Sequence, residues 1–180
     1  MTMNKALFLD RDGIINIDNG YVYQAEQFKF VEGIFDVCRY AQELGYQLIV
    51  ITNQPGIARG KYSEEEFLTL TSWMKNQFLK EKIIITDVFF CPHHPTKGLD
   101  HYKIECECRK PEPGMILKAA TKHKIDLKQS IFIGDKISDI KAAKNAGIHN
   151  RILLTGKYSE DGSLVAHRIT DIGMANEHIY

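Results

Sequence analysis

Short apolar stretches alternate with helical patterns along this chain. Apolar runs that stop at acidic, amide or glycine residues predict strands over residues 6–9, 48–51, 88–90, 131–133 and 152–154. Between these runs, apolar residues recur every three or four positions, which predicts helices over residues 34–44, 63–78, 113–123 and 138–146. Strands that alternate with helices indicate an α/β fold, with a mainly parallel sheet covered by helices on both faces.

Local signals mark where the predicted helices begin and end. Ser63 and Glu66 form a capping box at the start of one helix, and Pro113 suits the first turn of another. Gly45 and Gly147 are expected to close the first and last helices. In such folds, ligands bind beyond the carboxyl ends of the strands.

Polar clusters follow three of the predicted strands, so they should meet at one edge of the sheet. The clusters are Asp10-Arg11-Asp12-Gly13, Thr52-Asn53-Gln54-Pro55-Gly56 and Gly134-Asp135-Lys136, with Asp139 further on. Residues i and i+2 of a strand point the same way, so both carboxylates of the first cluster can face one mouth. A solvated turn is the alternative for that pair alone, but the convergence of three clusters favours a site.

The residue types in these clusters suit phosphoryl transfer. Several aspartates near one point favour Mg²⁺, which prefers oxygen ligands. Lys110 and Lys136 can neutralise a phosphate. One carboxylate can attack phosphorus, and a second can protonate the leaving oxygen and then activate water.

These motifs, in this order over residues 10–139, resemble the four motifs of the haloacid dehalogenase (HAD) superfamily of phosphohydrolases. The resemblance implies a three-layer Rossmann-like fold, with Asp10 as nucleophile and Asp12 as general acid–base. It also implies that Thr52 and Asn53 hold the phosphoryl group, with Lys110 as its counter-charge. Mg²⁺ would bind Asp10, Asp135 and the backbone carbonyl of Asp12. Asp139 would orient these ligands. Two positions depart from the usual pattern. Ile14 stands where Thr or Val is common, and Pro55, which has no N–H, stands where Ser is more usual.

Three of the four cysteines cluster around a segment with little secondary-structure signal. Cys91-Pro92-His93 and Cys106-Glu107-Cys108 have the composition of a closed Cys₃His zinc site, which would be structural. His94 is an alternative ligand, although the resemblance favours His93. Unrelated cysteines in a polar loop would be the other interpretation. The fourth cysteine, Cys38, has the helical spacing of a core residue.

The resemblance extends to a branch of the superfamily with no large cap domain. The gap between Asp12 and Thr52 is too short for such a domain. Arg109 and Lys110 directly follow Cys108, so zinc would fix both side chains over the phosphate pocket, and Arg109 could grip a second phosphate bidentately. The substrate pocket that the resemblance implies comprises Asp18, Asn19, Gly20, Tyr21, Gln54, Pro55, Arg109 and Lys136.

This branch implies a small phosphorylated substrate. The leading expectation is loss of the C7 phosphate from a heptose 1,7-bisphosphate, giving heptose 1-phosphate for the synthesis of nucleotide-activated heptose and lipopolysaccharide. Histidinol phosphate or another small sugar phosphate is the alternative, although Arg109 would be poorly matched to the amine of histidinol phosphate. A zinc-bearing interaction module without catalysis would require a missing catalytic residue, and none is missing.

Composition narrows the class of protein further. With 180 residues, we expect one domain over residues 1–180, including a zinc loop at about 91–108. Lys and Arg number 23, as do Asp and Glu, and a net charge of +0 argues against a nucleic-acid or membrane-surface partner. Charged residues at 10–12 interrupt the N-terminal apolar run before it reaches the length of a signal-peptide core, so we expect no signal peptide in this segment. We therefore expect a cytoplasmic monomer with reduced thiols.

Overall fold

A parallel sheet forms the centre of the protein. The computed structural model describes residues 3–156 and 164–180. Within these residues the sheet has six strands in the order β3-β2-β1-β4-β5-β6, and all neighbouring pairs are parallel. The strands are β1 (Lys5–Leu9), β2 (Tyr46–Asn53), β3 (Ile85–Cys91), β4 (Ile131–Gly134), β5 (Asn150–Leu154) and β6 (His167–Ile169).

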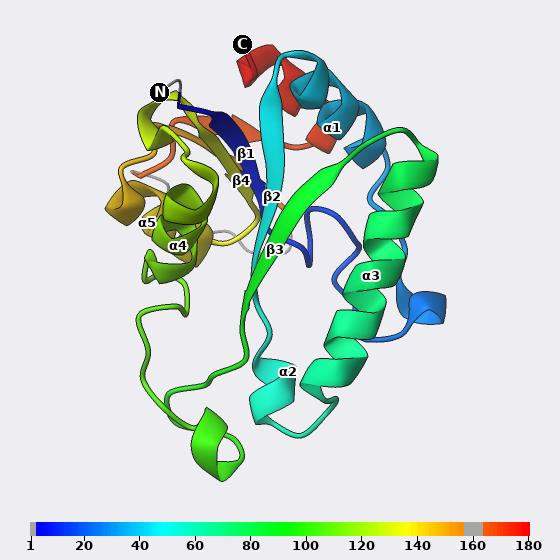
Figure 1. The fold of residues 1–180 in the computed structure, drawn as a ribbon, viewed down its shortest axis with the longest axis vertical. Helices are drawn as coiled ribbons and strands as arrows, with labels where there is room; N and C mark the ends of the chain where they lie inside the picture. Colours follow the sequence, from blue (N-terminus) through cyan, green and yellow to red (C-terminus); the bar gives the residue numbers. More distant parts are fainter. Residues whose placement is uncertain (1–2, 157–163) are drawn as a thin grey trace.

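Helices cover both faces of this sheet, which gives the three layers that the sequence predicts (Figure 1). One face carries α1 (Ile34–Glu43), α3 (Glu64–Lys80) and the 3₁₀ helix η4 (Ile172–His178), and the other carries α4 (Gly114–His123) and α5 (Ile137–Ala146). The shorter elements are α2 (Pro55–Ala58), η1 (Ala25–Gln27), η2 (Asp100–Tyr102) and η3 (Leu127–Gln129). Across the described ranges, no helix combines the length and apolar character that a membrane span requires.

The predicted α/β fold is confirmed, and the five predicted strands each match an observed one. The capping box of Ser63 and Glu66 opens α3, and Gly147 caps α5 in the left-handed conformation with φ 93°. Besides the 3₁₀ helices η1 to η4, the single turn α2 and the short edge strand β6 have no counterpart in the sequence prediction. With η4, β6 supplies the structure of residues 166–179, where the sequence pattern is weak. The segment 157–163 lies outside the described residues.

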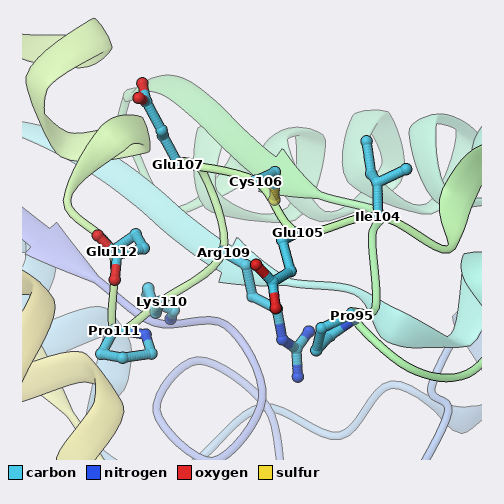
Figure 2. Close-up of a pocket in the computed structure, with 9 residues that line it drawn as sticks. All are labelled: Pro95, Ile104, Glu105, Cys106, Glu107, Arg109, Lys110, Pro111 and Glu112. Atoms are coloured by element: carbon cyan, nitrogen blue, oxygen red, sulfur yellow. The ribbon is translucent and has the colours of Figure 1, made fainter.

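The long connection between β3 and α4 contains the predicted zinc loop and folds back toward the sheet. Gly114 N donates to Glu107 O at 2.9 Å, which ties the loop to the start of α4. This connection lines an open cavity of about 580 Å³. Figure 2 shows the side chains around it. It is lined by Pro95, Ile104, Glu105, Cys106, Glu107, Arg109, Lys110, Pro111 and Glu112.

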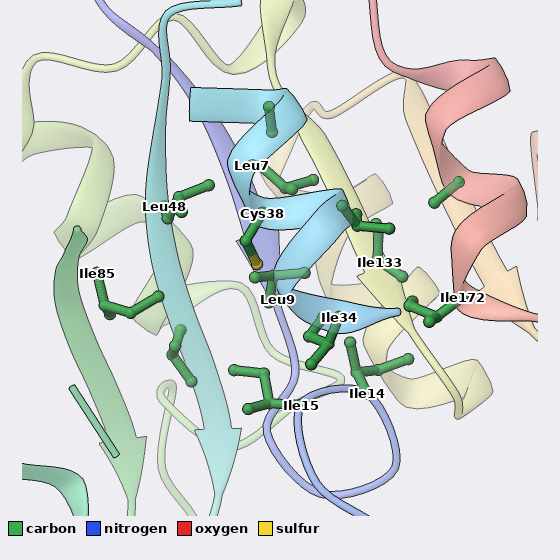
Figure 3. Close-up of a cluster of buried hydrophobic side chains, with 14 of the residues drawn as sticks. Leu7, Leu9, Ile14, Ile15, Ile34, Cys38, Leu48, Ile85, Ile133 and Ile172 are labelled. Atoms are coloured by element: carbon green, nitrogen blue, oxygen red, sulfur yellow. The ribbon is translucent and has the colours of Figure 1, made fainter. Parts of the chain in front are cut away.

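Two apolar layers hold the helices to the sheet. Leu7 and Leu9 of β1 point to the α1 side, whereas Ala6 and Phe8 point to the α4 side, as the two-residue period of a strand dictates. Figure 3 shows the first layer, in which Cys38 lies buried among aliphatic side chains, as the sequence predicts. Because the central strands are buried on both sides, the loops at their carboxyl ends start from a rigid base.

Candidate active site

Asp10 follows the last residue of β1, and a buried lysine reaches it from the β3–α4 connection. Lys110 Nζ lies 2.9 Å from Asp10 Oδ1 and 2.8 Å from Asp139 Oδ1, and it donates to Ile51 O at 2.7 Å. The backbone N–H of Arg11 also donates to Asp10 Oδ1, at 2.8 Å. Burial alone would lower the pKa of Lys110, but the charges of Asp10 and Asp139 outweigh it and raise this pKa. Lys110 is therefore a fixed cation beside the predicted nucleophile.

Three carboxylates converge at this point. Oxygens of Asp10, Asp135 and Asp139 lie within 4.8 Å of one another, and all three residues are buried. Burial and the charge of Asp10 raise the pKa of Asp135 to about 8, and burial and the charge of Asp139 raise that of Asp10 to about 6. Asp135 Oδ1 is buried and has no hydrogen-bond partner among the described residues. A hard divalent cation fits this donor set, since it would relieve the repulsion and engage the unsatisfied oxygen.

Asp139 organises this corner through the start of α5. Its Oδ2 accepts hydrogen bonds from the backbone N–H groups of Asp135 and Lys136, at 3.2 and 3.1 Å. With Oδ1 paired to Lys110, the side chain joins the β4–α5 turn to the β3–α4 connection. This arrangement suits an orienting role better than direct contact with a substrate.

The carboxylate of Asp12 lies outside this group of three and has a different set of partners. Its Oδ1 accepts from Arg11 Nη2 at 2.8 Å and from Asn16 Nδ2 at 3.0 Å, and its Oδ2 accepts from Gln54 Nε2 at 3.0 Å. Burial acts to raise the pKa of Asp12, but the charge and hydrogen bonds of Arg11, with those of Asn16 and Gln54, hold it below its usual range. Asp12 is therefore ionised at rest, and only its backbone carbonyl remains as its predicted magnesium ligand.

Thr52 and Asn53 stand at the end of β2, next to Asp10. The amide of Asn53 clamps the backbone of Lys110, since Asn53 Oδ1 accepts from Lys110 N at 3.0 Å and Asn53 Nδ2 donates to Lys110 O at 3.1 Å. Thr52 Oγ1 accepts from Gln54 Nε2 at 2.9 Å. Their predicted contacts with a phosphoryl group remain predictions, and the structure adds a positioning role for Asn53.

The predicted substrate residues come from several loops and have different partners. Lys136 Nζ lies 3.6 Å from Asp18 Oδ2, and burial, which would lower the pKa of Lys136, is outweighed by surrounding carboxylates. Tyr21 Oη accepts from Arg59 Nη1 at 2.9 Å. Arg109 Nη1 donates to His93 O at 3.1 Å, so its guanidinium is held at the cavity of Figure 2. Asn19 and Gly20 are exposed, Pro55 begins α2, and Gln54 is buried.

The predicted zinc residues also come together. The sulfur atoms of Cys91, Cys106 and Cys108 lie 3.1–3.5 Å apart, and His93 Nδ1 lies 3.4 Å from Cys108 Sγ. In a tetrahedral zinc site the sulfurs are about 3.8 Å apart, so the cluster fits this ion after a slight expansion. His94 faces elsewhere, because its Nδ1 accepts from the backbone of Thr96 and Lys97. The geometry thus favours His93 over His94.

Three further residues around the site are absent from the sequence prediction. Arg11 is 2% exposed and donates to Asp12 Oδ1 and Val22 O, and its guanidinium lies 5.7 Å from the Phe67 ring centre. Asn16 binds Asp12, and the hydroxyl of Tyr62 binds Gln54. The place of Arg11 between two aspartates is a signal in the sequence, whereas the other two depend on tertiary contacts.

Gly13 packs directly against the Asp135 carboxylate, in a backbone conformation that favours glycine. Its φ is 94°, and a Cβ there would collide with Asp135 Oδ2. We expect Gly13→Ala to displace the Asp135 carboxylate, weaken Mg²⁺ binding measured by calorimetry, and cost more than the roughly 1–2 kcal/mol of a left-handed alanine. Gly147→Ala is the matched control, since Gly147 has φ 93° and open space beside it. Equal Mg²⁺ affinity in both variants would contradict this account.

The sheet, the carboxylates at its carboxyl edge and the buried lysine define the class of HAD-like hydrolases. A family model described as HAD-hydrolase-like matches residues 107–172. A solved D,D-heptose 1,7-bisphosphate phosphatase from B. bronchiseptica, complexed with magnesium and phosphate, superposes with a TM-score of 0.80 at 26% identity and covers 96% of each chain.

Curated relatives narrow this class. A D-glycero-beta-D-manno-heptose-1,7-bisphosphate 7-phosphatase of Vibrio cholerae is 46% identical over 92% of this chain and 90% of the relative. The corresponding alpha enzyme of Burkholderia mallei is 50% identical over 91% of this chain and 85% of the relative. The chain therefore belongs to the heptose-1,7-bisphosphate 7-phosphatase family of HAD-like hydrolases.

Proposed function

We propose that this protein is a magnesium-dependent phosphatase that removes the C7 phosphate of D-glycero-D-manno-heptose 1,7-bisphosphate. The observation that carries the chemistry is the placement of buried Lys110 between Asp10 and Asp139, beside the unsatisfied oxygen of Asp135. The names of the relatives, at 43–50% identity, supply the substrate. The product, heptose 1-phosphate, would serve the synthesis of nucleotide-activated heptose.

The reaction divides into two halves at Asp10. Because Asp10 Oδ1 accepts from Lys110 and the Arg11 N–H, we assign the attack on phosphorus to Oδ2. The bond from phosphorus to the C7 oxygen breaks, and that oxygen takes a proton from Asp12. In the second half, Asp12 takes a proton from water, whose oxygen displaces the Asp10 carboxylate and releases phosphate.

Charge around the reacting group suits a phosphoryl dianion. Lys110, fixed by two carboxylates, stabilises the negative charge that develops on the phosphoryl oxygens. Mg²⁺, held by Asp10, Asp135 and the carbonyl of Asp12, would supply further neutralisation when bound. Since hydrogen bonds hold Asp12 in its ionised form, it is prepared as the base, and it must gain a proton before it serves as the acid.

Arg109 is the residue we assign to the second phosphate. Its guanidinium is positioned by His93 O at the cavity, and Arg109 directly precedes Lys110 in the chain. We further propose that zinc on Cys91, His93, Cys106 and Cys108 holds this segment in place, and that the enzyme works as a cytoplasmic monomer. Metal analysis and sedimentation test the zinc content and the monomer.

Phosphate release from competing substrates tests the proposed function. We expect turnover of heptose 1,7-bisphosphate with Mg²⁺ at a kcat/KM at least roughly tenfold above that for histidinol phosphate, because only the sugar presents a second phosphate to Arg109. The α and β anomers are assayed separately at equal concentration, since relatives of both names occur. Preference for histidinol phosphate would overturn the substrate and the role of Arg109. Inactivity on every substrate would overturn the phosphatase assignment.

A further inference from the structure

The side-chain amide of Gln54 contacts the acid–base residue Asp12, and both of its polar atoms are hydrogen-bonded to protein groups. Gln54 is 1% exposed, and its Nε2 donates to Asp12 Oδ2 at 3.0 Å and to Thr52 Oγ1 at 2.9 Å. Its Oε1 accepts the hydroxyl hydrogen of Tyr62. Since an ionised carboxylate only accepts hydrogen bonds, the NH₂ group must face Asp12, and the carbonyl must face Tyr62.

Tyr62 is itself held rigidly. Its side chain is 6% exposed, and its ring stacks on Tyr23 with ring centres 5.2 Å apart. Gly56, in α2, packs so closely against this ring that a Cβ there would collide with it. Burial raises the pKa of the Tyr62 phenol, so the hydroxyl keeps the hydrogen that it donates to Gln54. Removal of this hydroxyl would leave the buried Gln54 carbonyl without its hydrogen bond.

The two oxygens of Asp12 are not equivalent. Oδ1 accepts from both Arg11 and Asn16, which uses its two lone pairs. Oδ2 accepts from Gln54, which leaves one lone pair for a proton. Proton transfer in both halves of the reaction therefore runs through Oδ2, and the position of Oδ2 depends on the Gln54 amide.

We propose that Gln54 and Tyr62 are positioning residues for catalysis, because the Tyr62 hydroxyl fixes the Gln54 amide and that amide holds Asp12 Oδ2 in the geometry for proton transfer. The proposal rests on the proposed function, since it assumes that Asp12 transfers protons during phosphate release. It gives Gln54 a role inside the protein, in addition to the substrate contact that the sequence predicts.

The variant Tyr62→Phe isolates the hydroxyl, because the ring can keep its contacts with Tyr23 and Gly56. With heptose 1,7-bisphosphate and Mg²⁺, we expect kcat to fall roughly tenfold and KM to stay within about twofold. Tyr23→Phe is the matched control and should retain full activity. The thermal midpoint of each variant checks that the fold is intact, and Gln54→Met, which removes the amide at similar volume, gives a second route to the same defect.

Nitrophenyl phosphate separates positioning from general damage to the site. Its nitrophenolate leaves without a proton, so only hydrolysis of phosphorylated Asp10 still requires Asp12. Acid-quenched Tyr62→Phe should therefore carry a larger steady-state fraction of phosphoenzyme than the unchanged protein. The double variant that combines Tyr62→Phe with Gln54→Met should be no slower than Gln54→Met alone, since both changes act through the contact of the Gln54 amide with Asp12.

The outcomes discriminate between the two proposals. An unchanged phosphoenzyme fraction, a change in KM alone, or fully additive losses in the double variant would each overturn the positioning role. If the unchanged protein fails on the heptose substrate yet hydrolyses nitrophenyl phosphate, the substrate proposal is wrong, and the phosphoenzyme measurement still tests Tyr62.

Discussion

Asp10→Asn is expected to abolish phosphate release and to leave the fold at least as stable as before. Asparagine lacks the ionised carboxylate oxygen that attacks phosphorus, so no acyl phosphate intermediate forms and kcat should fall by more than roughly 10³-fold. Asn can still accept hydrogen bonds from Lys110 and the Arg11 N–H at the position of Oδ1. Activity is measured as phosphate released, and acid quenching should trap no phosphoenzyme.

Although Asp10→Asn loses activity, its fold should be at least as stable as that of the unchanged protein when Mg²⁺ is absent. Burial and the charge of Asp139 raise the pKa of Asp10 to about 6, which reports that its ionised form is disfavoured in the metal-free protein. A neutral side chain removes one charge from the cluster, and Lys110 keeps Asp139 as its partner. We expect the thermal midpoint in EDTA to stay the same or rise by a few degrees, about 2–4 °C for each 1 kcal/mol gained.

An exposed aspartate provides the control for this variant. Asp36 on α1 has a side chain 77% exposed and pairs only with nearby Arg39 among the ion pairs of the described residues, so Asp36→Asn should leave kcat unchanged. Full turnover by Asp10→Asn would remove Asp10 from the role of nucleophile. A large drop in its metal-free midpoint would instead show that repulsion among the carboxylates does not limit stability.

The sequence pattern was sufficient for the elements that carry the core. Strands such as β1 and β2 are buried on both faces, so they appear as continuous apolar runs that end in polar residues. The short elements escaped prediction for physical reasons. β6 has three residues at the sheet edge, of which only Ile169 is buried, and α2 is a single turn. Neither is long enough to show a period.

The site was predictable where it depends on strand order, and less so where it depends on side-chain direction. The carboxyl ends of β1, β2 and β4 meet because these strands are adjacent in a parallel sheet. The two-residue period suggested that the Asp10 and Asp12 carboxylates share one mouth. That expectation stays a prediction, and the structure adds the hydrogen-bond partners of Asp12, namely Gln54 and Asn16, which the period does not predict.

Contacts between distant parts of the chain could not be predicted from the sequence alone. The clamp of Asn53 on the Lys110 backbone joins positions 57 residues apart. The hydroxyl of Tyr62 reaches Gln54 only because Gly56 lets α2 pack against its ring. Each contact depends on how a loop packs, and loop packing leaves no periodic signal in a single sequence.

Loss of zinc from the loop should reduce activity, although the magnesium ligands themselves are unchanged. Cys108→Ser is expected to remove bound zinc, measured by elemental analysis of the purified protein, and to lower kcat/KM by about 10–100-fold. Cys108 directly precedes Arg109 and Lys110, and Arg109 is also tied to the loop through His93 O. Burial raises the pKa of Cys91 and of Cys108, so without a metal these two thiols stay protonated. Burial acts to raise the pKa of Cys106 as well, but hydrogen bonds from the other two thiols outweigh it and lower this pKa. The metal-free loop is therefore held only by weak thiol hydrogen bonds at this cluster.

Cys38→Ala is the matched control for this experiment. Cys38 is buried in α1, in the apolar layer on the opposite side of the sheet from Cys91, so this variant should lose some stability and keep its zinc. Limited proteolysis should cut Cys108→Ser within residues 92–107 faster than Cys38→Ala, because only the first variant frees the loop. Purified protein that contains no zinc and is fully active would refute the zinc assignment. Zinc loss with full activity would show that the Asn53 clamp on the Lys110 backbone and the ion pairs of its ammonium with Asp10 and Asp139 position this lysine without zinc.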